Sequence, residues 1–166
     1  MESIIKSIRK SLEDKNYLAA LSLALTIPDV CSHVEYPNEK SVGKRYTDWY
    51  NKYVDVEFNG LHPQSNPNNL PIPPRFSSDD CYELRCAVLH SGNTDMKTNK
   101  VNFNRFKLFR KINVQGGVEW ETGKPQTAQT YIHLDITRFC TLMCDVAEKY
   151  YNLRKADFSK YHIEIQ

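Results

Sequence analysis

The sequence lacks the features that define several common protein classes. Its net charge is only +2 over 166 residues, so any contact with nucleic acid must come from a local patch. No P-loop, G-x-S-x-G or H-E-x-x-H motif is present, so no motif predicts a nucleotide-binding, α/β-hydrolase or zinc-protease site. None of the five cysteines stands in a C-x2-C pair. We therefore expect reduced core thiols, with neither disulfides nor a metal site.

A long hydrophobic run is also missing. The most apolar stretch, residues 17–27, is interrupted by Ser22 and Thr26 and is well short of the roughly 20 residues that span a bilayer. The first ten residues carry charged side chains where a secretion signal would be apolar. The sequence therefore predicts a cytoplasmic protein with no membrane contact.

What is present is a hydrophobic content of 40%, enough for one domain with its own core over residues 1–166. Apolar residues recur at helical spacing in residues 2–13 and 41–54, and residues 17–26 are apolar on all sides, as in a central bundle helix. Pro28 either ends that helix or lies in the first turn of a short following one. The first 54 residues are thus predicted to be helical.

Residues 55–76 interrupt this pattern. Five of the eight prolines fall in this stretch, at positions 63, 67, 71, 73 and 74. Regular structure is not expected there, so we predict a long proline-rich loop that leads directly into the next helix.

The second half of the chain contains a segment of different periodicity, residues 103–134. Alternating apolar residues over 106–114 and again over 118–121, with a Gly-Gly turn between them, predict a β-hairpin, and residues 130–134 favour a third strand. Asp135 can then cap a C-terminal helix over 135–155. The predicted fold is a mainly α helical bundle with a small antiparallel sheet inserted before the last helix.

The helix predicted over residues 77–92 carries the most informative residues. Ser77 or Ser78 can cap its first turn, and Gly92 lies just past its end. Arg85 falls within the apolar arc of this helix, where an arginine needs a partner because an unpaired buried charge is costly. The candidate partners are a ligand phosphate or one of three carboxylates: Glu35, Asp48 and Asp145.

Arg85 and His90 form an R-x4-H motif that resembles the signature of the HEPN superfamily, small all-helical ribonucleases of bacterial toxin–antitoxin and phage-defence systems. The segments 27–37 and 45–49 also resemble stretches that accompany this motif in a group of small bacterial proteins. Active HEPN nucleases often have Asn, Asp or His after the motif arginine, whereas this chain has Cys86.

The resemblance implies a metal-independent RNA endonuclease, or an RNA-binding relative, that needs no cofactor. His90 would act as general base or acid and Arg85 would stabilise the charge on the scissile phosphate. The 2′-hydroxyl would be the nucleophile, which restricts the reaction to RNA and leaves a cyclic phosphate. The family usually completes this site across a homodimer.

Two further interpretations stay open at this point. Arg85 can be a structural ion pair and His90 a helix C-terminal histidine stabilised by the dipole, in which case the chain is a non-catalytic interaction or regulatory module for a partner protein. Basic residues that could contact RNA phosphates are equally explained as solvated faces. These residues are Lys44, Arg45, Lys107, Arg110 and Lys111.

Overall fold

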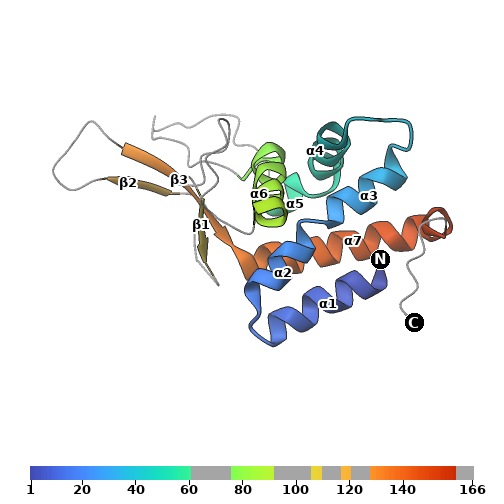
Figure 1. The fold of residues 1–166 in the computed structure, drawn as a ribbon, viewed down its shortest axis with the longest axis horizontal. Helices are drawn as coiled ribbons and strands as arrows, with labels where there is room; N and C mark the ends of the chain where they lie inside the picture. Colours follow the sequence, from blue (N-terminus) through green and yellow to red (C-terminus); the bar gives the residue numbers. More distant parts are fainter. Residues whose placement is uncertain (61–75, 92–105, 110–116, 121–127, 160–166) are drawn as a thin grey trace.

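The computed structural model describes residues 1–60, 76–91, 106–109, 117–120 and 128–159, and these are mainly helical (Figure 1). The helices are α1 (Glu2–Glu13), α2 (Tyr17–Ala24), α3 (Ile27–Glu35), α4 (Val42–Tyr53), α5 (Asp55–Asn59), α6 (Ser78–Ser91) and α7 (Ile136–Phe158). The long helix α7 lies along the bundle, and α1, α2 and α3 pack against it. Helix α4 packs on α3, and α6 packs on α4. The predicted helical bundle is therefore confirmed in outline.

The helix ends follow local sequence signals. Pro28 lies in the first turn of α3, the second of the two alternatives that the sequence left open. Asp135 caps α7 as predicted, its Oδ1 accepting the Arg138 backbone N–H at 2.9 Å. Helix α7 continues past the predicted end at residue 155 to Phe158, with non-helical backbone angles at Arg154.

The prediction of an irregular segment over 55–76 is wrong at its start, where the chain forms α5. The prolines begin only at position 63, so nothing before it prevents a helical turn. Phe58 of α5 is buried, with its ring 5.5 Å from that of Phe139 on α7, and this packing holds the short helix on the bundle. Residues 61–75 of the predicted loop lie outside the described residues.

An aromatic cluster forms much of the core. Trp49 of α4 is fully buried and its ring meets Tyr150 of α7 edge to face at 5.7 Å. Phe76, which directly precedes the motif helix, packs on Phe139 at 5.5 Å in the same geometry. Large rings in this arrangement bury much apolar area and add a directional attraction, so they fix α4, α7 and the start of α6 relative to one another.

Three strands complete the described residues: β1 (Phe106–Phe109), β2 (Gly117–Trp120) and β3 (Ala128–Asp135). Their order is β1-β3-β2, with β1 parallel and β2 antiparallel to β3. The predicted hairpin, which joined the first two strands in an all-antiparallel sheet, is therefore wrong. β3 is the longest strand and runs directly into α7 with Leu134 buried, so it is the strand fixed to the bundle and the other two pair with its opposite edges.

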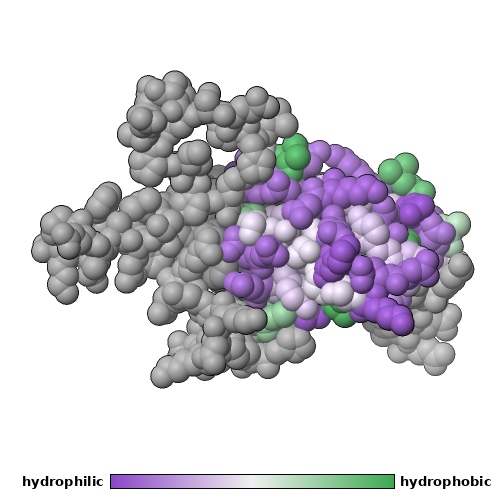
Figure 2. All heavy atoms as spheres, turned by 90° about the horizontal axis from the view of Figure 1, so that it is seen from above, coloured by the Kyte–Doolittle hydropathy of each residue, from purple (hydrophilic) through white to green (hydrophobic). Residues whose placement is uncertain are grey.

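The outer surface is largely polar where it can be viewed. Seen from above the bundle, the described residues are mainly hydrophilic, with small separate hydrophobic spots (Figure 2). Among the described residues, one stretch, Tyr17–Glu35, has the length and apolar composition of a membrane-spanning helix. Half of it is buried inside the bundle, and the core helices of soluble proteins have the same composition.

Candidate functional site

The helix that carries the R-x4-H motif begins with a reciprocal cap. The Oγ of Ser77 accepts the backbone N–H of Asp80 at 3.1 Å, and the carboxylate of Asp80 accepts the backbone N–H of Ser77 at 3.0 Å. The Ser77 hydroxyl also donates to the same carboxylate at 2.6 Å. This capping box fixes the first turn of α6, as the serines of the sequence predicted.

Tyr46 of α4 holds α6 against the rest of the bundle. Its hydroxyl donates to the carbonyl of Leu25 at 3.0 Å and lies 3.3 Å from the sulfur of Cys81 on α6. Its ring meets that of Tyr82 edge to face at 5.2 Å. Gly43 allows the Tyr82 ring to pack closely on the backbone of α4, because a Cβ at position 43 would lie 3.2 Å from that ring. Helix α6 is thus held against α4 through Cys81 and Tyr82.

The partner of Arg85 is Asp29, in the first turn of α3. The Nε of Arg85 donates to Oδ2 of Asp29 at 2.9 Å, and the two side chains are 18% and 20% exposed. Burial alone would lower the pKa of Arg85, but the charge of Asp29 and their hydrogen bond raise it overall, so the guanidinium stays charged. The motif arginine is therefore paired at the edge of the bundle and still reachable from solvent.

The prediction that Arg85 pairs with one of three carboxylates, Glu35, Asp48 or Asp145, is wrong. Each already binds a different cation, because the helix packing turns it away from α6. Asp48 accepts from Lys44 one turn earlier on α4, and Asp145 of α7 accepts from Arg9. Glu35 lies six residues after Asp29 on α3 and forms a separate network.

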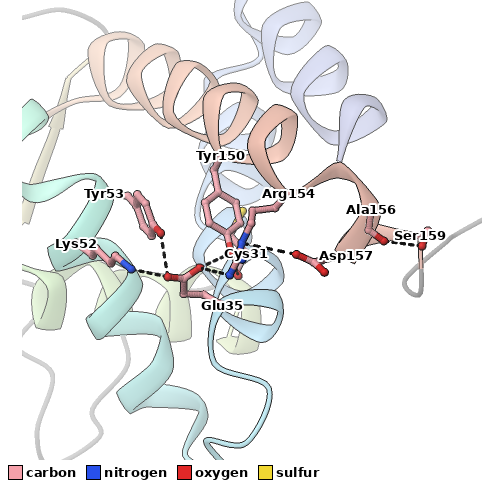
Figure 3. A network of polar contacts seen from close by, with 9 residues as sticks. All are labelled: Cys31, Glu35, Lys52, Tyr53, Tyr150, Arg154, Ala156, Asp157 and Ser159. Atoms are coloured by element: carbon pink, nitrogen blue, oxygen red, sulfur yellow. Dashed lines mark hydrogen bonds and ion pairs between the residues drawn. The ribbon is translucent and has the colours of Figure 1, made fainter.

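The Glu35 network joins α3, α4 and α7 (Figure 3). The side chain is only 8% exposed, and its two oxygens accept from Lys52 at 2.5 Å, Tyr53 at 2.9 Å, Tyr150 at 2.9 Å and Arg154 at 3.0 Å. Burial would raise the pKa of Glu35, but the hydrogen bonds from Lys52, Tyr150 and Tyr53 together lower it to about 2. The network cross-links three helices.

Cys86, which follows the motif arginine, is part of the same surface as Arg85. The Nη1 of Arg85 lies 3.9 Å from its sulfur, a weak hydrogen-bond acceptor. Cys86 is half-buried, whereas the other four cysteines are buried as the sequence predicted. The described part of the candidate site thus consists of Asp29, Arg85 and Cys86, with Tyr82 beside them on α6.

The other predicted site residues are only partly described. His90 lies five residues after Arg85 on α6, but its side chain is outside the described residues, so its role stays a prediction. Lys107 lies in β1, where its backbone pairs with that of His133, and its side chain is likewise not described. Arg110 and Lys111 fall outside the described residues altogether.

Lys44 and Arg45 of α4, which were predicted to contact RNA phosphates, both have partners within the protein. Lys44 binds Asp48 at 2.6 Å and Glu39 at 3.4 Å, and Arg45 donates to the backbone carbonyl of Glu39 at 3.3 Å. These partners reduce the positive charge that α4 can offer to RNA phosphates. The structure therefore brings neither Lys44 nor Arg45 into the Arg85 cluster.

Asp29 is the residue that sequence reasoning missed. An aspartate after a proline in a first helical turn is explained by the helix dipole alone, and no motif links it to a residue 56 positions later. Among the described residues, no group of three or more His, Cys, Asp or Glu side chains could hold a metal ion.

No protein-family model matches the chain, and neither a curated protein nor a solved structure matches it at a significant level.

Proposed function

We propose that this protein is a HEPN-like, metal-independent RNA endonuclease that uses Arg85 and His90 of α6. The observation that carries the proposal is the environment of Arg85. The Nε of the motif arginine donates to Asp29 at the edge of the bundle, and the arginine side chain is 18% exposed. A charged group fixed at a solvent-accessible edge is suited to binding a phosphate.

The proposed reaction needs only groups that RNA and the protein supply. His90 takes the proton of a ribose 2′-hydroxyl as the 2′-oxygen forms a bond to phosphorus. The bond from phosphorus to the 5′-oxygen breaks, giving a 2′,3′-cyclic phosphate and a 5′-oxygen that a second acid protonates. In a homodimer, His90 of the second copy supplies that acid. Arg85 stabilises the negative charge that grows on the phosphate oxygens.

The test is cleavage of single-stranded RNA in the presence of a chelator. We expect wild type to cut RNA and leave a DNA strand of the same sequence intact, because DNA has no 2′-hydroxyl. Arg85→Ala and His90→Ala should each lose activity by about 100-fold or more. Mass spectrometry of the fragments should find cyclic phosphate ends.

Arg9→Ala is the matched control, because Arg9 is also an ion-paired arginine but lies on α1, with Asp145 and Glu148 of α7. It should cut RNA as wild type does. A wild type that leaves RNA intact, or variants of Arg85 and His90 that cut as well as wild type, would show that the proposal is wrong.

The second candidate function is a non-catalytic module that binds a partner protein of a toxin or defence system. The observation that favours it is that Arg85 already has an internal carboxylate partner in Asp29. Under this alternative the wild type neither cuts nor binds RNA, and it is a monomer in light scattering. A dimer that cuts RNA would exclude it.

A further inference from the structure

Asp29 and Arg85 are joined by only one hydrogen bond. The Nε of Arg85 donates to Oδ2 of Asp29 at 2.9 Å. The other carboxylate oxygen, Oδ1, is buried and accepts no hydrogen bond from any described residue. The pair is therefore not the bidentate ion pair that arginine and a carboxylate commonly form.

This geometry shows which N–H group of the guanidinium Asp29 binds. In a bidentate pair the carboxylate takes N–H groups from two nitrogens of the guanidinium, whereas here Asp29 takes the Nε–H alone. The Nη1 group lies 3.9 Å from the sulfur of Cys86, which is a weak acceptor. A phosphate oxygen is a far stronger acceptor for a guanidinium N–H than a thiol sulfur is.

The unpaired Oδ1 gives a second indication. A buried acceptor without a hydrogen bond is unfavourable, and such groups in folded proteins call for a reason other than stability. The carboxylate of Glu35 on the same helix shows the contrast, since both of its oxygens accept two hydrogen bonds each.

We propose that Asp29 is a positioning residue for Arg85: it holds the Nε–H and so orients the Nη groups toward the scissile phosphate of a bound RNA. This inference rests on the proposed RNA cleavage. Asp29 acts through Arg85 and does not touch the RNA, because Oδ1 is buried and Oδ2 is bonded to Nε.

The test compares Asp29→Ala with Asp29→Asn. Alanine removes the acceptor, whereas asparagine keeps a side-chain oxygen that can accept the Nε–H and removes only the charge. A misplaced guanidinium should lower kcat by about 10- to 100-fold in Asp29→Ala. Asp29→Asn should recover a large part of this loss, and thermal unfolding checks that both variants are folded.

RNA affinity gives a readout that a purely structural role would not produce. With a 2′-O-methyl RNA strand that cannot be cut, Asp29→Ala should weaken binding in the wild-type background and have no further effect in an Arg85→Ala background. Asp145→Asn is the control, since it alters the carboxylate that pairs with Arg9 at 3.2 Å and should leave both RNA cleavage and RNA binding unchanged.

The outcomes separate the two proposals. A wild type that neither cuts nor binds RNA overturns the proposed function and the positioning role together. A wild type that cuts RNA, with folded Asp29 variants equal to it or faster, overturns only the positioning role, because Asp29 would then be neutral or inhibitory. Equal losses of affinity from Asp29→Ala with and without Arg85 would also overturn it.

Discussion

Replacing Glu35 by glutamine should destabilise the protein in a manner that depends on pH. Burial would raise the pKa of Glu35, but the hydrogen bonds from Lys52, Tyr150 and Tyr53 lower it from 4.5 to about 2 in the folded chain. This difference corresponds to about 3 kcal/mol of preferential stabilisation of the ionised form. The side chain is only 8% exposed, so solvent screens this stabilisation little.

The direction of the pH effect follows from the lowered pKa. Glu35 contributes its full stabilisation above the pKa of the unfolded chain, near 4.5, and loses it as the pH falls toward about 2. At neutral pH the free energy of unfolding of Glu35→Gln should therefore be lower than that of wild type by up to about 3 kcal/mol. The difference should shrink steadily below about pH 5, because wild-type Glu35 then takes up a proton and resembles glutamine.

Urea unfolding from neutral pH to about pH 3 measures this difference. Glu148→Gln is the matched control: Glu148 binds Arg9 at 2.8 Å but is 49% exposed, so its loss should cost less than about 1 kcal/mol. A Glu35→Gln variant as stable as wild type at neutral pH would refute the reasoning. A difference that stays constant down to pH 3 would refute the ionic part of it.

Two other changes test the surroundings of the motif helix. Tyr46→Phe removes the hydrogen bond to the Leu25 carbonyl and the contact with Cys81, and it should lower the free energy of unfolding in urea by about 1 to 2 kcal/mol. Cys86 should be the first cysteine that iodoacetamide alkylates in the native protein, as mapped by mass spectrometry, because the other four are buried and burial raises the pKa of Cys81 to about 12 and that of Cys144 to about 11. Alkylation of Cys81 ahead of Cys86 would contradict the packing of α6.

Local sequence signals predicted the helices well. The cap at Ser77 and the cap at Asp135 each depend on one side chain and a backbone N–H three residues later, so a short stretch of sequence contains all the information. The same holds for the amphipathic pattern of α1. Strand pairing was predicted less well, since the Gly116-Gly117 pair in the sequence predicts where the chain turns but not which strand it then pairs with.

The partner of Arg85 could not be predicted for a different reason. The sequence showed that a charge in the apolar arc of α6 needs a counter-ion, and this expectation is confirmed. The choice among the carboxylates depends on how α3, α4 and α6 pack, because Asp29 and Glu35 lie at different heights on α3 and face different directions. Helix periodicity fixes the faces of each helix but not which helix it meets.

The two carboxylates of α3 differ in how completely they are hydrogen-bonded. Glu35 is saturated with hydrogen bonds from α4 and α7, so any change there first costs stability. One oxygen of Asp29 accepts the Nε–H of Arg85, and the other is buried and accepts no hydrogen bond from the described residues, an arrangement that stabilises the fold less than a bidentate pair would. Folding alone gives no reason to prefer this arrangement to a bidentate pair. The proposed positioning of Arg85 does give one, and it predicts that changes at Asp29 affect the proposed RNA cleavage more than stability, whereas changes at Glu35 do the reverse.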